Sequence, residues 1–253
     1  MKKTDYSKIA DRYDKNKKRK DIQLDTVLEE YIKRIAREEY YVLDLACGTG
    51  NYLSAQVEAF KEYRINWFGL DSSEEMLQIA KDRVNNVEYY KGFAEDLPYE
   101  PEKFDFIANN YAFHHFEDKP KVLDAIKRIL RKDGILHMKN ISTQHMKRWW
   151  IYQYFPMTYN EDQKRFWQDE QIFQELENRG FEVQIKIDYT LHRTRLFELH
   201  DQAKNRDISQ LNIISEKDYE QGLNKMKQDL KNAPNLRIVS EGALLSCVAR
   251  KNE

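Results

Sequence analysis

The stretch V-L-D-L-A-C-G-T-G at residues 42–50 decides the fold of this chain. Its first half is apolar and carries Asp44 near its end, which is typical of a buried strand, and its second half consists of small residues. Residues 51–61 are compatible with a helix, so the free N–H groups at the helix start would point into the turn. A nucleotide-like ligand is therefore expected there. The small residues that leave room for it at the backbone are Ala46, Gly48 and Gly50.

The same stretch indicates which nucleotide is expected. A dinucleotide fingerprint would need a third glycine at position 53, where Leu53 stands. The carboxylate of Asp44 would repel a pyrophosphate, whereas it suits a cationic amine. The string D-L-A-C-G-T-G, with Cys47 at its centre, resembles the first motif of class I S-adenosylmethionine (SAM)-dependent methyltransferases. The alternative is a glycine-containing turn in another kind of α/β protein.

A second apolar stretch, W-F-G-L-D at residues 67–71, ends in Asp71, about twenty residues after the glycine turn. An acid at the end of the second strand can accept hydrogen bonds from both hydroxyls of a ribose. Ser72 and Glu75 fit a capping box that starts a helix with Met76 on its apolar face. We expect Ser72 and Met76 beside the cofactor. As an isolated residue, Asp71 would read as an ordinary acid at a helix start.

A third landmark is V-E-Y-Y-K-G-F-A-E-D-L-P at residues 87–98, a strand followed by a polar turn. It looks like the adenine-side loop of the same superfamily, usually G-D-A-E-x-L-P. Phe93 stands where Asp is common, so we expect its ring to lie along the adenine, with the Ala94 N–H facing the base and Glu95 in the same loop. Packing of Phe93 in the core is the alternative.

The fourth landmark is F-D-F-I-A-N-N-Y-A-F-H-H-F at residues 104–116. Asn109 and Asn110 would stand at the carboxyl end of a buried strand, where ligands bind in open α/β sheets. The pattern resembles the fourth-strand region of methyltransferases typified by enzymes of ubiquinone and menaquinone biosynthesis. His114 and His115 follow the strand and are candidates for a general base. A structural role for both is the alternative.

The four landmarks occur in family-like order over residues 40–140. They imply an α/β fold: a Rossmann-like, seven-stranded, mostly parallel sheet with helices on both faces and an added helical and aromatic cap. We predict one methyltransferase domain over residues 1–253, with helices at 191–206 and 215–231 in the cap. Its SAM-binding core would comprise residues 38–140, 181–188 and 240–250, and its cap residues 1–37, 141–180 and 189–239.

Composition restricts the partners. The 253 residues are 41% apolar and 34% charged and carry a net charge of −1, which offers no overall attraction to nucleic acid. We expect no membrane span, no signal peptide and a cytoplasmic protein. The two cysteines indicate neither a disulfide framework nor a metal site, so no metal is expected.

Two segments outside the core carry aromatic residues that could face a ligand. Residues 1–20 contain Tyr13 in Y-x-x-I-A-x-x-Y-D, which looks like the N-terminal segment that folds over the cofactor in related small-molecule methyltransferases. That resemblance makes Tyr13 a cofactor-binding candidate. Residues 147–167 interleave aromatic and basic side chains.

These observations predict a SAM-dependent methyltransferase that transfers a methyl group to a small-molecule acceptor by in-line displacement and releases S-adenosylhomocysteine. An RNA methyltransferase is an alternative, because residues 147–167 suit base stacking. A non-catalytic SAM-binding protein is another, since a fold does not prove a chemistry. Nucleic acid is not the expected partner, and a homodimer is left open.

Overall fold

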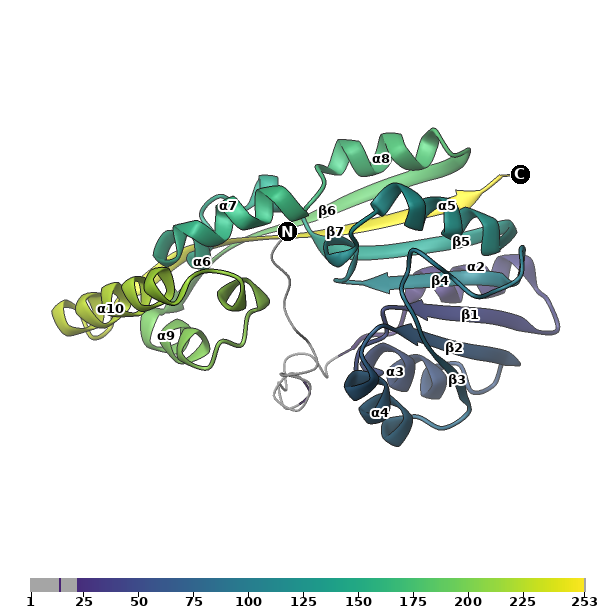
Figure 1. Ribbon diagram of the computed structural model, residues 1–253, viewed down its shortest axis with the longest axis horizontal. Helices are drawn as coiled ribbons and strands as arrows, with labels where there is room; N and C mark the ends of the chain where they lie inside the picture. The colour runs from purple at the N-terminus through teal and green to yellow at the C-terminus, as the bar shows by residue number, and fades with distance from the viewer. Residues whose placement is uncertain (1–13, 15–21, 253) are drawn as a thin grey trace. The chain divides into compact units, whose positions relative to one another are not determined.

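The computed structural model describes residue 14 and residues 22–252 (Figure 1). The predictions for Tyr13 and for the rest of residues 1–20, except Asp14, therefore lie outside the described residues. Within the described residues the chain divides into two compact units. The core unit holds residue 14 and residues 22–140, 170–186 and 246–252. The insert unit holds residues 141–169 and 187–245.

Seven strands form one sheet in the order β3-β2-β1-β4-β5-β7-β6. The pairs β1–β2, β2–β3, β1–β4 and β4–β5 are parallel, so the predicted seven-stranded, mostly parallel sheet is confirmed. Its strands are β1 (Tyr40–Leu45), β2 (Ile65–Asp71), β3 (Val87–Lys91), β4 (Phe104–Asn110), β5 (Leu130–Ile141), β6 (Phe181–Arg195) and β7 (Arg237–Lys251).

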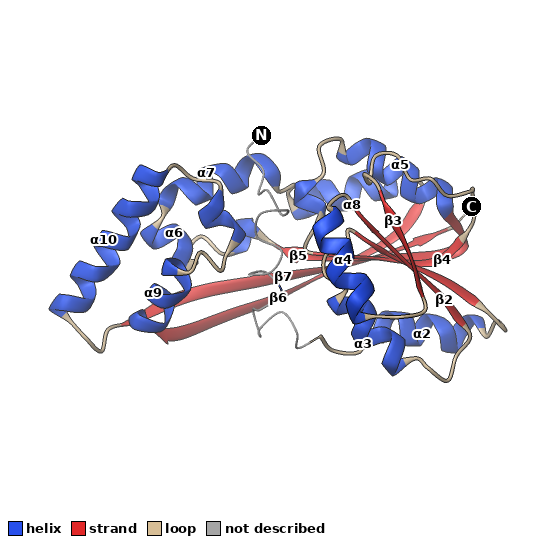
Figure 2. Cartoon of the chain, turned by 60° about the horizontal axis from the view of Figure 1, so that its bottom comes forward, coloured by secondary structure: helices blue, strands red, loops and turns tan. Residues whose placement is uncertain are grey.

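Helices cover both sides of the strands in the core unit. Figure 2 shows α5 on one side and α2 and α3 on the other. Carboxylates begin two of them, because the side chains of Asp25 and Asp118 accept hydrogen bonds from backbone N–H groups of the first turn. The bounds are α2 (Thr26–Ile35), α3 (Asn51–Ala59), α4 (Glu74–Arg83), α5 (Lys119–Ile129) and α8 (Asp169–Glu177).

The start of α4 differs from the prediction by one residue. Ser73, not Ser72, is the cap, and its hydroxyl accepts from the N–H of Met76. Ser72 is exposed. The physical reason is that the N–H of Ser73 donates to the Asp71 carboxylate, so the chain turns around Asp71 before the helix begins.

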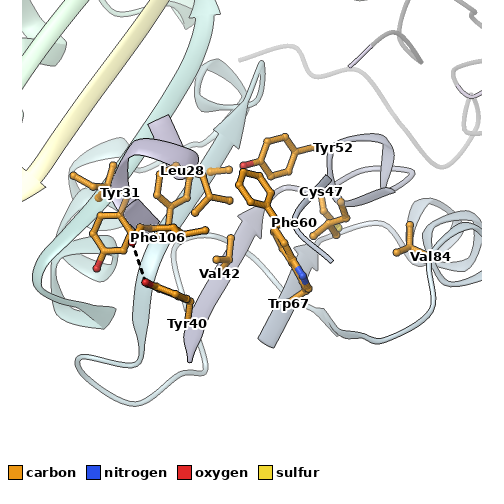
Figure 3. Packing of buried hydrophobic residues seen from close by; sticks show 14 of the residues in the cluster. Leu28, Tyr31, Tyr40, Val42, Cys47, Tyr52, Phe60, Trp67, Val84 and Phe106 are labelled. Carbon is orange, nitrogen blue, oxygen red and sulfur yellow. Dashed lines mark hydrogen bonds between the residues drawn. The ribbon is translucent and has the colours of Figure 1, made fainter. Parts of the chain in front are cut away.

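One part of the core lies where α2 and α3 pack on the sheet (Figure 3). Val42 of β1, Trp67 of β2 and Phe106 of β4 are buried there, and the ring of Tyr31 packs against that of Phe106 with centroids 6.3 Å apart. Cys47 of the glycine turn belongs to the same cluster. The turn therefore rests on packed side chains, which hold its backbone in place.

The insert unit has a core of its own, built from aromatic and aliphatic side chains of its helices. Ser215 caps α10, which confirms the predicted helix at 215–231. The predicted helix at 191–206 is wrong over its first turn, because β6 continues to Arg195 beside β7. The helices are α6 (Trp150–Tyr154), α7 (Pro156–Arg165), α9 (Leu196–Lys204) and α10 (Glu216–Asn232).

Candidate functional site

The glycine turn follows β1 directly and joins it to α3. Three of its residues have left-handed backbone angles, with φ of 62° at Ala46, 54° at Gly48 and 74° at Gly50. The N–H of Cys47 donates to the carbonyl of Leu70 at 3.0 Å, which ties the turn to β2. Two of the three left-handed positions are glycine, where this conformation costs least.

The two glycines have different roles. A Cβ placed on Gly48 would meet no atom within 4 Å, so this side of the turn is open to a ligand. A Cβ on Gly50 would lie 3.0 Å from the Cβ of Ala80, so Gly50 lets α4 approach the turn. Gly50 is therefore needed for close helix packing, while contact of the cofactor with Gly48 and Gly50 stays a prediction.

Asp71 ends β2 and holds the glycine turn. Its carboxylate accepts hydrogen bonds from the N–H of Gly48 at 2.8 Å and from the N–H of Ser73 at 2.9 Å. Burial raises the pKa of Asp71, while these backbone donors lower it. A carboxylate oxygen can accept more than one hydrogen bond, so this geometry leaves capacity for a ribose hydroxyl.

Asp44 is the most perturbed acid of the site. It is 2% exposed, and burial together with the neighbouring charge of Asp71 raises its pKa to about 8. The amide of Asn110 acts in the opposite direction. A cationic ligand group beside Asp44 would stabilise its carboxylate. SAM has such groups, an ammonium and a sulfonium. The carboxylates of Asp44 and Asp71 therefore fit this cofactor.

The adenine-side loop presents an aromatic face. Phe93 is 65% exposed, so the alternative in which it packs in the core is wrong. Ala94 beside it is buried. The carboxylate of Glu95 accepts from the N–H of Glu117 at 2.9 Å and thereby joins this loop to the segment before α5. The exposed ring of Phe93 is therefore available for stacking on a base.

The end of β4 carries the two asparagines. The amide of Asn109 donates to the carbonyl of Leu45 at 2.9 Å and so joins the ends of β4 and β1. His114 is 5% exposed and lies against His115, with ring centroids 3.9 Å apart. Burial orders His114, and the role of either histidine as a general base stays a prediction. Met76 of α4 is buried, and its contact with the cofactor also stays a prediction.

Two polar clusters near the turn were not predicted from the sequence. Asp25 lies 2.9 Å from Nδ1 of His137 and accepts from the hydroxyl of Tyr52 at the same distance. The guanidinium of Arg83 donates to Asn51 and to Thr49 of the turn. The partners lie 27 to 112 residues apart, so no local pattern marks them.

No multi-residue metal site was found in the part of the chain that the structure describes: three or more His, Cys, Asp or Glu side chains do not gather there. The helices described above also include none with the length and apolar character needed to cross a membrane.

A sheet of this order, with an open glycine turn between two acidic strand ends, defines a nucleoside-binding α/β protein of the methyltransferase type. Residues 36–195 match a family described as a methyltransferase domain. The chain belongs to this family and is a SAM-dependent methyltransferase. SAM is its methyl donor and S-adenosylhomocysteine its product.

Relatives in other organisms carry related names. The ubiquinone/menaquinone biosynthesis C-methyltransferase UbiE of Campylobacter jejuni strain 81-176 is 29% identical over 64% of this chain and 76% of that protein. The demethylmenaquinone methyltransferase of Thermotoga maritima is 31% identical over 61% of this chain and 68% of the relative. The match to UbiE of another C. jejuni strain, at 34% identity, spans 44% of this chain but only 46% of that protein.

Solved structures share the fold. YcgJ of Bacillus subtilis superposes with a TM-score of 0.60 at 19% identity, covering 90% of this chain and 99% of that chain. Phosphoethanolamine N-methyltransferase 2 of Haemonchus contortus, solved with phosphomonomethylethanolamine and S-adenosylhomocysteine, has a TM-score of 0.54 at 19% identity. The superposition covers 90% of this chain and 53% of the H. contortus protein.

The Asp71→Ala variant should bind SAM about 10- to 100-fold more weakly than the wild-type protein, because a hydrogen bond to a charged group contributes roughly 1.5–3 kcal/mol. The variant also removes the acceptor that orients the Gly48 N–H. Calorimetric titration with SAM measures the change. An unchanged affinity in a folded variant would refute the assignment of Asp71 to the ribose.

Substitution at the two glycines should separate binding from stability. Gly48→Val should abolish SAM binding and lower the melting temperature modestly, because the new side chain points into open space and costs mainly backbone strain. Gly50→Val should instead destabilise the fold, since its side chain would collide with Ala80. Thermal melts and SAM titrations of both variants check this. Normal SAM binding by Gly48→Val would contradict the assigned role.

Proposed function

We propose that this methyltransferase acts on a small-molecule acceptor. In this proposal Asp71 and Asp44 bind the ribose and the amino-acid end of SAM, respectively. The small residues of the turn, Phe93 and the end of β4 complete the cradle. Its further members are Ala46, Cys47, Gly48, Gly50, Ser72, Met76, Ala94, Glu95, Asn109 and Asn110.

The observation that carries the choice of acceptor is that five of the eight aromatic side chains at residues 147–167 are buried. An RNA-binding surface needs exposed rings on which bases can stack. The rings of Trp150, Tyr152 and Phe155 are instead buried in the core of the insert unit. They pack on one another and on α9 and α10, so they are used for folding and not for stacking on bases.

The names of the relatives support the same choice. UbiE of C. jejuni is named for ubiquinone/menaquinone biosynthesis, and the T. maritima relative is named for demethylmenaquinone. The net charge of −1 also gives the chain no general attraction to a polyanion. A small acceptor with an apolar body is therefore the favoured substrate class.

The chemistry requires orientation more than proton transfer. Bound SAM supplies an electrophilic methyl group on a sulfonium. The residues of the chain hold the cofactor by its two ends, exclude water and align the acceptor for in-line attack. If the acceptor arrives protonated, as a phenol or an enolisable carbon would, His114 or His115 removes its proton.

The test is incubation of the purified protein with methyl-labelled SAM and either a small-metabolite extract or total tRNA. We expect label in the small-molecule fraction and none in the tRNA, at both low and moderate salt. Label in tRNA would overturn the proposal in favour of the RNA alternative. Binding of SAM without turnover in either fraction would favour a non-catalytic SAM-binding protein.

A further inference from the structure

Arg83, the last residue of α4, connects three segments that lie far apart in the sequence. One guanidinium nitrogen donates to the side chain of Asn51 at 2.6 Å and to the hydroxyl of Thr49 at 3.1 Å, and also to the Thr49 carbonyl. The other nitrogen pairs with the carboxylate of Asp14. Both side chains of this ion pair are largely buried, with exposures of 18% for Arg83 and 20% for Asp14.

The partners of Arg83 lie in or beside segments that are predicted to bind the cofactor. Thr49 and Asn51 flank Gly50 in the glycine turn, and Thr49 is buried. Asp14 is the final residue of the Y-x-x-I-A-x-x-Y-D motif, directly after Tyr13. A planar guanidinium offers donors on two edges, so one edge can hold the turn while the other holds Asp14.

We propose that Arg83 is a positioning residue for the cofactor, which holds the glycine turn and is itself held by Asp14. It acts through Thr49, Asn51 and Asp14. The turn fixes the guanidinium in advance, so pairing with Asp14 costs little further side-chain entropy. Pairing with Asp14 and cofactor binding favour the same orientation of Arg83 and the turn, so each strengthens the other by the same factor.

A double-mutant cycle on ligand affinity tests this coupling. Titration calorimetry with S-adenosylhomocysteine is carried out on the full chain as wild-type, Asp14→Ala, Arg83→Ala and the double variant. We expect about fivefold weaker binding for Asp14→Ala and about tenfold or more for Arg83→Ala. The double variant should bind no more weakly than Arg83→Ala, because Asp14 acts only through Arg83.

Matched variants separate positioning from general stability. Lys81 lies on the same helix and forms an exposed ion pair with Glu74. The Lys81→Ala variant removes this basic side chain and should bind the ligand normally. Arg83→Lys should be intermediate, because an ammonium lacks the planar fork. If Arg83→Ala does not fold, Asp14→Ala and Asp14→Asn still test the link, because they remove the same ion pair from its other side.

The lysine variant provides a readout that a purely structural role would not change. Arg83→Lys should recover part of the affinity that Arg83→Ala loses, because it restores a charged donor to Asp14. Multiplicative losses of affinity in the double variant, unchanged affinity in folded Asp14→Ala, or an affinity of Arg83→Lys no higher than that of Arg83→Ala would each overturn the proposal.

Discussion

The Asp44→Asn variant is expected to be more stable than the wild-type protein at neutral and alkaline pH, and to lose most of its affinity for SAM. Asp44 is fully buried at the end of β1, and burial raises its pKa to about 8. The unfolded chain releases this proton near pH 4, at the ordinary pKa of an aspartate. Between these two values the folded state binds the proton and the unfolded state does not.

The sign of the pH dependence follows from this difference in bound protons. Because the native state holds the extra proton, the free energy of unfolding falls as pH rises from about 4 to about 8, and levels off above that range. An amide of the same shape does not titrate. The advantage of Asp44→Asn should therefore be small near pH 4 and grow to the order of 5 kcal/mol at about pH 9.

Urea unfolding of both proteins near pH 5, 7 and 9 measures the effect, and SAM titration measures the loss of binding. The amide lacks the charge that a cationic group of the cofactor would meet, so affinity should fall by at least about tenfold. An Asp44→Asn variant that is less stable than the wild-type protein at pH 9 would contradict the unfavourable ionisation of this buried acid.

The matched substitution Asp105→Asn should have the opposite effect on stability. Asp105 is also fully buried, at the start of β4, but two guanidinium groups surround it. Its carboxylate accepts from Arg131 at 2.6 Å and from the N–H of Tyr41 at 2.8 Å, and lies 3.2 Å from Arg37. In Asp105→Asn, the NH2 group of the amide would face the N–H donors of the two arginines or of Tyr41, with which it cannot form hydrogen bonds.

Breaking such a buried, paired charge costs about 3–5 kcal/mol. We expect a loss of about 3 kcal/mol for Asp105→Asn, because Arg37 and Arg131 are partly exposed and can turn to solvent. SAM affinity should stay unchanged, since Asp105 and Asn110 are at opposite ends of β4. The same urea and SAM titrations check this. Equal stability of this variant and the wild-type protein would refute the role of the Asp105 cluster.

The two substitutions are chemically identical, and both positions carry an aspartate in an apolar strand of the sequence. Local patterning predicted the strand in each case, because alternation and apolar runs depend on which residues must be buried. It did not predict the difference in charge environment. Asp105 forms ion pairs with Arg131 and Arg37, which come from separate segments of the chain. For Asp44, burial and the like charge of its neighbour Asp71 instead raise the pKa.

The core of the fold was predictable from the sequence because its signals are local. Small residues between a buried strand and a helix make the glycine turn, and acids at the ends of β1 and β2 follow within the same short stretches. The seven-stranded, mostly parallel sheet came with the family resemblance and is confirmed, whereas the strand order comes from the structure. Ser73 displaced Ser72 as the cap of α4 because Asp71 bonds the Ser73 N–H.

By itself, the sequence determined the turn, the acids on either side of it and the class of cofactor, since each depends on residues next to one another. Only the tertiary structure decided the rest. Because β6 pairs with β7, it extends to Arg195, although the local sequence from residue 191 onward predicted a helix. Packing joined Arg83 to Asp14 and the turn, and His137 to Asp25. Such contacts form between segments that chain folding brings together, so no local pattern records them.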